Sequence, residues 1–231
     1  MLNIGGLQKV SLIDYPGKIS AIVFLQGCNF RCPYCHNPEL VNPKLYGPRI
    51  DEETILSFLA KRIGKLDAVT ITGGEPTLQE GLPEFIRKVR DLGFQIKLDT
   101  NGSHSAMIEA LIEENLVDYI AMDVKGPLRR YDRVCRVNVE KDEITNSIRT
   151  LLNASVDYEF RTTFVKGLLT EEDVPDLGEL IRGARLFVLQ NFAPSKTLDE
   201  RYLSRKPLSP GELEQIKNEL GRYVEKVTIR A

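Results

Sequence analysis

Cys28-Asn-Phe-Arg-Cys32-Pro-Tyr-Cys35 is the stretch that decides the fold and the chemistry of this 231-residue chain, because it holds three of the four cysteines. Thiolates are soft ligands that suit iron–sulfur clusters. Three cysteines on one loop can hold three irons of a cubane cluster and leave the fourth iron free to bind a substrate. A cluster that only transfers electrons usually has a fourth cysteine ligand. The remaining cysteine, Cys135, lies far along the chain.

Two other uses of clustered cysteines compete with an iron–sulfur cluster. A structural zinc ion would take His36 as its fourth ligand, but zinc ligands usually come as two separated pairs and the sequence has no second pair. Cys32-Pro-Tyr-Cys35-His36 also matches the pattern of haem attachment, which leaves Cys28 unexplained. Disulfides are not expected in a chain of this size without an export signal. Zinc and haem stay open as less favoured alternatives.

The composition is that of a globular protein. Hydrophobic residues make up 42%, charged residues make up 28%, and the net charge is −2. This balance indicates neither a nucleic acid nor a membrane as partner. The longest apolar runs, such as residues 19–25, have the length of a strand and not of a membrane span. The first residues lack the basic region and apolar stretch of a signal peptide. We therefore expect a cytoplasmic, reducing location.

Apolar, β-branched runs alternate with segments whose apolar residues recur at helical spacing. Thr170-Glu-Glu-Asp173 and Ser209-Pro-Gly-Glu212 resemble capping boxes and mark two helix starts. The expected strands cover residues 19–25, 68–72, 95–99, 119–123, 158–165, 186–190 and 226–229. The expected helices carry the apolar groups Ile55, Phe58, Leu59 and Ile63; Leu82, Phe85, Ile86 and Val89; Ile108, Leu111 and Ile112; Ile144, Ile148, Leu151 and Leu152; Val174, Leu177 and Ile181; and Leu213, Ile216 and Leu220.

Repeated strand–helix units predict a parallel sheet with right-handed crossovers. A full eight-unit barrel typically needs about 250 residues, whereas this chain offers about six units and a final strand. The predicted fold is therefore α/β, an incomplete (β/α)6 TIM-type barrel. We expect a single domain over residues 1–231, with residues 1–18 as an N-terminal extension or hairpin and residues 193–207 as a loop.

Glycines and polar residues gather at the predicted strand ends. Ligands of such sheets bind outside the carboxyl ends of the strands. These residues should therefore meet on one rim. They are the cysteine loop, Gly73-Gly-Glu-Pro76, Asp99-Thr-Asn-Gly102, Asp123-Val-Lys125, Arg161 within the fifth strand, and Gln190-Asn-Phe192.

The stretch from Gly27 to Pro38 resembles the cluster loop of radical S-adenosylmethionine (SAM) enzymes, and Gly73-Gly-Glu-Pro76 is also typical of them. More narrowly, residues 7–41 resemble the activating enzymes of glycyl-radical enzymes, especially those of anaerobic ribonucleoside-triphosphate reductase. The resemblance implies a [4Fe–4S] cluster held by Cys28, Cys32 and Cys35, with SAM on its open iron. It implies reductive cleavage of SAM to a 5′-deoxyadenosyl radical, which takes a Cα hydrogen from a glycine of the partner. The implied partners are an anaerobic ribonucleotide reductase and a flavodoxin or ferredoxin as electron donor.

The resemblance also implies roles for residues on the rim. The motif of Gly73, Gly74, Glu75 and Pro76 would hold the amino group of SAM, since glycines let backbone approach a ligand closely. A plain strand-to-helix turn is the simpler alternative. Tyr34 would pack near the adenine. Asn191 and Phe192 stand where formate-lyase activators have a histidine near the adenine, which leaves the adenine contacts of Asn191 in doubt.

Charged residues on the next strands would complete this SAM site. Asp99, in Asp-Thr-Asn101-Gly, and Asp123 would lie beside a monovalent cation, and Lys125 would pair with the SAM carboxylate as a point charge. Arg161 interrupts an apolar strand, and because arginine is rarely buried without a partner, we expect it to face the SAM carboxylate or ribose. The alternatives are that Asp99–Gly102 is only a polar turn, that Lys125 is a surface lysine and that Arg161 faces outward.

No side chain is expected to act as acid, base or nucleophile, since such cofactors carry the difficult chemistry themselves. Two other functions remain open. A radical SAM enzyme acting on a small molecule, as deazaguanine synthases do, would be equally compact. A non-enzymatic iron–sulfur electron carrier would not need the glycine motif or Lys125 on the same rim. His36 and Cys135 have no assigned role, and Cys135 is expected to be an incidental thiol and not a ligand.

Overall fold

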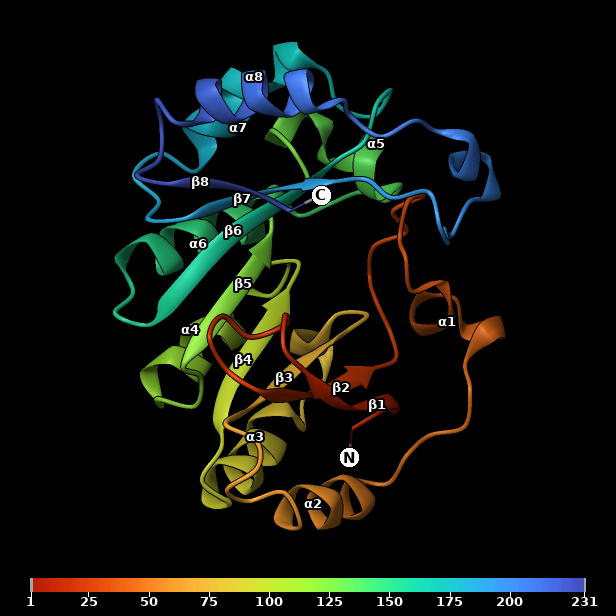
Figure 1. The fold of residues 1–231 in the computed structure, drawn as a ribbon, viewed down its shortest axis with the longest axis vertical. Helices are drawn as coiled ribbons and strands as arrows, with labels where there is room; N and C mark the ends of the chain where they lie inside the picture. The colour runs from red at the N-terminus through yellow and green to blue at the C-terminus, as the bar shows by residue number, and fades with distance from the viewer. Residues whose placement is uncertain (1, 231) are drawn as a thin grey trace.

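A computed structural model describes residues 2–230, which form one eight-stranded sheet in the order β1 to β8 (Figure 1). β1 runs antiparallel to β2, and every later pair is parallel. The strands are β1 Ile4–Ser11, β2 Ser20–Leu25, β3 Ala68–Gly73, β4 Gln95–Thr100, β5 Tyr119–Asp123, β6 Asp157–Phe164, β7 Phe187–Asn191 and β8 Val227–Arg230. The helices are α1 Pro38–Val41, α2 Glu52–Ala60, α3 Leu82–Asp91, α4 Ser105–Glu113, α5 Tyr131–Cys135, α6 Lys141–Asn153, α7 Val174–Leu180 and α8 Pro210–Leu220.

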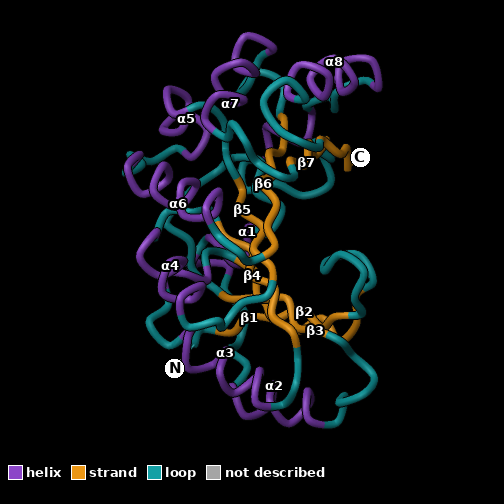
Figure 2. The backbone as a smooth tube through the Cα atoms, turned by 90° about the vertical axis from the view of Figure 1, so that its left-hand side faces the viewer, coloured by secondary structure: helices purple, strands orange, loops and turns teal. Residues whose placement is uncertain are grey.

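The sheet curves but does not close. Across residues 2–230, β1 and β8 remain the two edges of the sheet and do not pair. Figure 2 shows the strands as an open curve with most helices on its outer side. This architecture confirms the predicted incomplete barrel, with β2 to β8 as its parallel strands.

Burial explains why these segments become strands and helices. β3 and β5 have continuous buried runs, which is typical of parallel strands covered on both faces. α3 buries Leu82, Phe85, Ile86 and Val89, the stripe expected from its helical spacing. Both predicted capping boxes form, at Thr170–Asp173 and at Ser209–Glu212. The alternation of buried strand segments and helices with one buried face therefore determines which parts of the chain become strands and which become helices.

One local prediction needs correction. The helix expected to reach Ile63 ends at Ala60, and Ile63 is 56% exposed because the chain turns at Gly64, which has a φ of 74°. The N-terminal segment, expected to be an extension or hairpin over residues 1–18, contains the strand β1 and makes an antiparallel hairpin with β2. The predicted loop 193–207 contains only the short 3₁₀ turn Glu200–Ser204. Among residues 2–230, no helix is long and apolar enough to cross a membrane.

Candidate active site

A cavity of about 430 Å³ lies at the carboxyl ends of the strands and gathers most of the predicted site residues. Its walls come from the cysteine loop after β2 and from the ends of β3 to β7. The predicted residues that line it are Cys28, Cys32, Tyr34, Cys35, Gly73, Gly74, Asp99, Asn101, Asp123, Lys125 and Arg161. Among the residues not predicted as binding residues, the lining includes Asp14, Phe30, His36, Thr100, Thr163 and Gln190.

The cysteine loop is held in its conformation by hydrogen bonds between its own residues. Nη1 of Arg31 donates to the carbonyl oxygens of Cys28, at 2.6 Å, and Phe30, at 2.8 Å. The Cys35 amide donates to the carbonyl of Cys32 at 3.0 Å. Cys32 is buried, whereas Cys28 and Cys35 are half-buried at the cavity wall. These contacts fix three soft thiol ligands on one side of the cavity.

The surroundings of the three thiols differ. Burial raises the pKa of Cys28 to about 12 and also raises the pKa of Cys35. A hydrogen bond from Cys135 outweighs burial at Cys32 and lowers its pKa to about 7. Within residues 2–230, no three Cys, His, Asp or Glu side chains converge as they would around a single metal ion. The thiols line the cavity individually, and their chemistry suits a cluster in which each binds a different iron.

His36, the fourth ligand required by the zinc alternative, is engaged elsewhere. Its Nε2 lies 2.9 Å from the carbonyl oxygen of Ala193, and its ring stacks on Phe192 with centroids 5.7 Å apart. Phe192 is 1% exposed. His36 therefore ties the cysteine loop to the segment that follows β7.

Gly73 and Gly74 permit a close approach between two loops. A Cβ atom on Gly74 would lie 1.9 Å from the carbonyl oxygen of Gly27, and Gly73 has a φ of 126°. The amides of Gly74 and Glu75 donate to the carbonyls of Leu25, at 2.8 Å, and Gly27, at 2.7 Å. These two amides are therefore paired with the end of β2 and with the residue that precedes the cysteine loop. Only glycine fits where the loops touch.

Glu75 does not reach the cavity, contrary to its predicted place in the SAM site. It is 1% exposed, and its Oε1 accepts hydrogen bonds from the hydroxyls of Thr77, at 2.6 Å, and Thr100, at 2.7 Å. Its Oε2 accepts from the amide of Asn101 at 2.6 Å. Burial raises the pKa of this carboxyl. Pro76 is buried in the turn that follows and does not line the cavity either. Glu75 therefore links the loop after β3 to the end of β4 and the loop that follows it through hydrogen bonds.

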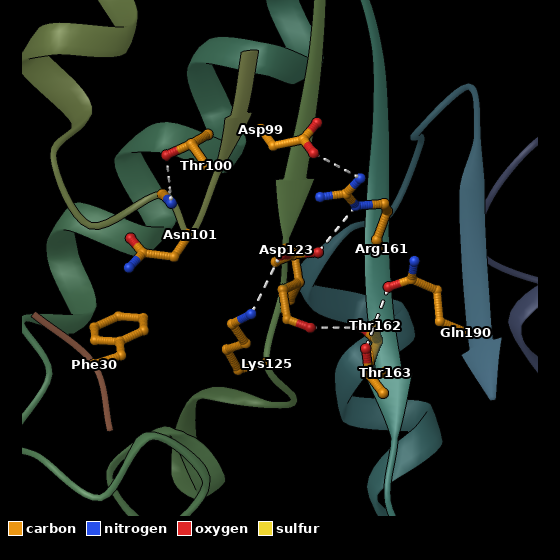
Figure 3. A network of polar contacts seen from close by, with 12 residues as sticks. Phe30, Asp99, Thr100, Asn101, Asp123, Lys125, Arg161, Thr162, Thr163 and Gln190 are labelled. Atoms are coloured by element: carbon orange, nitrogen blue, oxygen red, sulfur yellow. Dashed lines mark hydrogen bonds and ion pairs between the residues drawn. The ribbon is translucent and has the colours of Figure 1, made fainter. Parts of the chain in front are cut away.

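A network of charged side chains forms the opposite wall of the cavity (Figure 3). Asp123 Oδ2 lies 3.3 Å from Nζ of Lys125, and its Oδ1 lies 3.0 Å from Nε of Arg161. Arg161 also lies 3.5 Å from Asp99, which contacts the buried Lys97. Burial acts to raise the pKa of Asp123, but Arg161 and Lys125 outweigh it and lower this pKa to about 2. Asp123 is therefore ionised at neutral pH.

Lys125 and Arg161 are held charged by the same network. Burial alone would lower the pKa of Lys125, but Asp123 outweighs it and raises this pKa well above its usual value. Arg161 is 8% exposed and has carboxylate partners in Asp123 and Asp99. The cavity thus presents cationic groups with fixed positions, which suit a carboxylate ligand.

Asn101 contacts the cysteine loop from the end of β4, and Tyr34 belongs to that loop. The Asn101 amide nitrogen donates to Asn29 Oδ1 at 3.0 Å and lies 3.9 Å from Sγ of Cys28. Tyr34 is 6% exposed and forms part of the cavity wall. Both therefore belong to the wall beside the thiols.

Asn191 is another correction, because its side chain points away from the cavity. Its amide exchanges two hydrogen bonds with the backbone of Leu208, at 3.0 Å and 2.9 Å. It closes the base of the long loop that precedes α8. The neighbouring Gln190 lines the cavity instead, and its Oε1 accepts a hydrogen bond from Thr163 at 3.2 Å. Successive residues of a strand face opposite sides of the sheet. Gln190 therefore faces the cavity, and its neighbour Asn191 does not.

Comparison with known proteins identifies the class. The family model for the radical SAM superfamily matches residues 22–181, and the chain therefore belongs to this superfamily. It is an enzyme of the glycyl-radical-enzyme activating type. The family implies a [4Fe–4S] cluster and SAM. The donor set of the cysteine loop and the cationic wall opposite fit both groups.

Individual relatives agree with this assignment. A Methanocaldococcus jannaschii protein named "Putative glycyl-radical enzyme activating enzyme" is 36% identical over 98% of this chain and 95% of its own length. The pyruvate formate-lyase-activating enzyme of Clostridium pasteurianum is 28% identical over 86% of this chain and 84% of its own. The 7-carboxy-7-deazaguanine synthase of Aquifex aeolicus is 33% identical, but over only 38% of each chain. Streptococcus suis SuiB shares the fold with a TM-score of 0.66 at 13% identity, over 89% of this chain and 47% of SuiB.

Proposed function

We propose that this protein activates a glycyl-radical enzyme by generating a radical on a backbone glycine, with an anaerobic ribonucleotide reductase as the first candidate partner. The observation that carries the proposal is one cavity that combines three loop cysteines with the fixed cations Lys125 and Arg161. A bound [4Fe–4S] cluster and SAM supply the reductive cleavage that yields a 5′-deoxyadenosyl radical. A flavodoxin or ferredoxin is the proposed source of the electron.

The chain's own residues hold these groups in place. Cys28, Cys32 and Cys35 are the proposed cluster ligands. Lys125 pairs with the SAM carboxylate, and Arg161 keeps Asp123 ionised beside it. Gly73 and Gly74 shape the wall next to the cysteine loop, and Tyr34, in the cavity wall, packs near the adenine of SAM. No side chain in this arrangement is required to move a proton.

A monovalent cation beside Asp99 and Asp123 is part of the same proposal. Both carboxylates already face Arg161, so a cation there would act as an additional charge and not as the sole counter-ion.

Asp99→Asn is expected to remove any dependence of SAM cleavage on added potassium or sodium. The check is the initial rate of 5′-deoxyadenosine formation across a series of salts at constant ionic strength. Equal dependence in the wild type and the variant would reject this cation site.

The N-terminal hairpin supports a protein as the substrate. Its loop brings Asp14 to the cavity and leaves Leu12 71% and Ile13 85% exposed beside it. Exposed apolar side chains next to a binding site are typical of protein contact surfaces. They fit a partner that presents a glycine loop better than they fit a small polar metabolite. The deazaguanine-synthase alternative rests on relatives that are similar over 38–49% of the chain.

Ile13→Ser is expected to weaken activation of the partner without changing SAM cleavage in its absence. Loss of one buried isoleucine contact would cost about 1.5–3 kcal/mol, or roughly ten- to a hundredfold in the concentration of partner required. The measurement is the yield of glycyl radical against partner concentration. Ile63→Ser is the matched control, because Ile63 is 56% exposed and does not line the cavity. An equal effect of both variants, or none from Ile13→Ser, would argue against docking at this loop.

A further inference from the structure

A group of exposed cationic side chains lies on α5 and on the loop that follows β7. We call it the cationic surface, and it consists of Arg133, Arg136, Arg201, Arg205 and Lys206. The whole chain has a net charge of −2, so this concentration of positive charge is a local feature. None of the five side chains lines the cavity, and the residues that hold SAM do not include them.

Contacts between the two segments make the cationic surface continuous. The guanidinium groups of Arg136 and Arg205 both lie over the ring of Tyr202, 5.6 Å and 5.4 Å from its centroid. Arg133 donates to the carbonyl oxygen of Gly167 at 2.9 Å, and Arg205 also lies against this glycine. Helix α5 and the loop after β7 therefore present their cations together.

Little negative charge offsets these cations. Asp199 pairs with Arg136 and with Arg201, each at 2.7 Å, but its own side chain is only 13% exposed, whereas that of Arg201 is 80% exposed. Arg133 and Arg205 bind backbone carbonyl oxygens, and within residues 2–230 they have no carboxylate partner. The surface therefore presents uncompensated positive charge to a binding partner.

The cationic surface is attached directly to the cysteine loop. The Asp199 amide donates to the carbonyl oxygen of Pro33 at 2.9 Å, and the Arg31 amide donates to the carbonyl oxygen of Cys135, at the end of α5, at 2.8 Å. Pro33 directly follows Cys32, one of the proposed cluster ligands. A protein bound to this surface would therefore contact the two segments that hydrogen-bond the cysteine loop.

Two further features are typical of a contact surface. Arg136 ends α5 in the left-handed conformation, with a φ of 54°, which is uncommon for a residue other than glycine and is found most often at functional sites. Leu203 is 43% exposed between the cations at 201 and 205, with the exposed Glu200 at the margin. An apolar side chain within a charged rim is the usual composition of a protein interface.

We propose that an acidic one-electron carrier protein docks on the cationic surface and reduces the cluster from there. The inference rests on the proposed function, which requires such a donor. One electron leaves the reduced carrier and enters the cluster, and no atom is exchanged. Positive charge steers and selects a partner of negative charge. The β1–β2 hairpin lies well apart from the turn Glu200–Ser204 (Figure 1), so the carrier and the glycine-bearing partner have separate surfaces.

The test uses the reconstituted holoenzyme, with a reduced flavodoxin of net negative charge as the probe. Arg133→Glu combined with Lys206→Glu reverses two exposed charges. The second-order rate of cluster reduction by flavodoxin is expected to fall by roughly tenfold or more at low ionic strength. The difference from the wild type should shrink at high ionic strength, because salt screens exposed charges. Equilibrium binding of oxidised flavodoxin, which does not depend on turnover, should weaken in the same direction.

A second variant and a matched control accompany this one. Arg133→Gln combined with Arg205→Gln removes two charges but keeps amide donors for the backbone carbonyl groups, and should show a smaller loss of the same sign. Lys61→Glu combined with Lys65→Glu makes the same change in net charge at exposed lysines just beyond α2. This control should keep the wild-type rate and affinity. SAM cleavage driven by dithionite should be unchanged in all three double variants.

The docking inference fails if the charge-reversal variant binds flavodoxin and is reduced as the wild type is, or if the α2 control loses as much. It also fails if the wild type does not bind flavodoxin. A lower yield of glycyl radical with dithionite as the reductant would overturn it as well, by assigning the surface to the glycyl-radical partner. Absence of dithionite-driven SAM cleavage in the wild type would instead reject the proposed function.

Discussion

Alanine at Cys28, Cys32 or Cys35 is expected to abolish SAM cleavage. Each thiolate is proposed to hold a different iron, and no other cysteine lines the cavity to replace it. The loss should therefore be complete and not partial, in contrast to the removal of one hydrogen bond. The measurements are iron and sulfide content after anaerobic reconstitution, and 5′-deoxyadenosine formed with SAM and dithionite. Each single variant should form none above background.

Cys135→Ala is the control for this experiment, because it removes a buried cysteine that does not line the cavity. Its iron content is expected to match that of the wild type. A variant at Cys28, Cys32 or Cys35 that still held a full cluster and cleaved SAM would contradict the assignment. A full complement of zinc in place of iron and sulfide, in protein purified without oxygen, would revive the zinc alternative.

Lys125→Met is expected to produce the second-largest loss, a fall of roughly ten- to over a hundredfold in SAM affinity. Lys125 lines the cavity, and its pKa is raised because Asp123 holds it in the charged form. Removal of one charge-assisted hydrogen bond costs about 1.5–3 kcal/mol, which corresponds to that change in affinity. Methionine keeps a long side chain in the same space. The measurement is equilibrium binding of SAM to the loaded enzyme, with iron content determined in parallel.

Lys166→Met provides the matched control for charge. Lys166 is also paired with a carboxylate, Glu212, at 2.6 Å, but it does not line the cavity. Its SAM affinity should stay at the wild-type value. Arg161→Ala is expected to weaken SAM binding as well, and also to lower thermal stability. It removes one of the two cationic partners of Asp123, leaving Lys125, and one of the two of the buried Glu159, leaving Arg230. Unchanged SAM affinity in Lys125→Met would mean that the SAM carboxylate lies elsewhere.

The sequence predicts the strands well because most of them are short segments rich in apolar, β-branched or aromatic residues. β5 spans Tyr119–Asp123 as expected, and the other parallel strands differ at their ends by about one residue. Helix ends are harder, since α2 stops at Ala60 where the turn at Gly64 overrides the helical spacing of Ile63. The hairpin strand β1 is weakly marked because it lies at the edge of the sheet. The exposed Gln8, Lys9 and Val10 give it little apolar signal.

The site was predictable where residues end a strand and face inward, as Asp123 does. It was not predictable where tertiary contacts decide orientation. Glu75 lies inside a binding motif, yet its carboxylate is buried, because it accepts hydrogen bonds from the hydroxyls of Thr77 and Thr100 and from the amide of Asn101. Asn191 and Gln190 differ by one position, and only the observed register shows which one faces the cavity. Asp14 reaches the cavity from a hairpin loop that carries no local signal of binding.

The central claim is that this enzyme places a radical on a backbone glycine of a partner protein. The most direct measurement is electron paramagnetic resonance of the partner after incubation with this protein, SAM and reductant. The claim predicts a glycyl doublet on the partner, which disappears when the target glycine is replaced by alanine and when Cys28→Ala enzyme is used. The result that would contradict it is SAM cleavage coupled to a small metabolite, with no protein radical formed on any glycyl-radical enzyme encoded in the same genome.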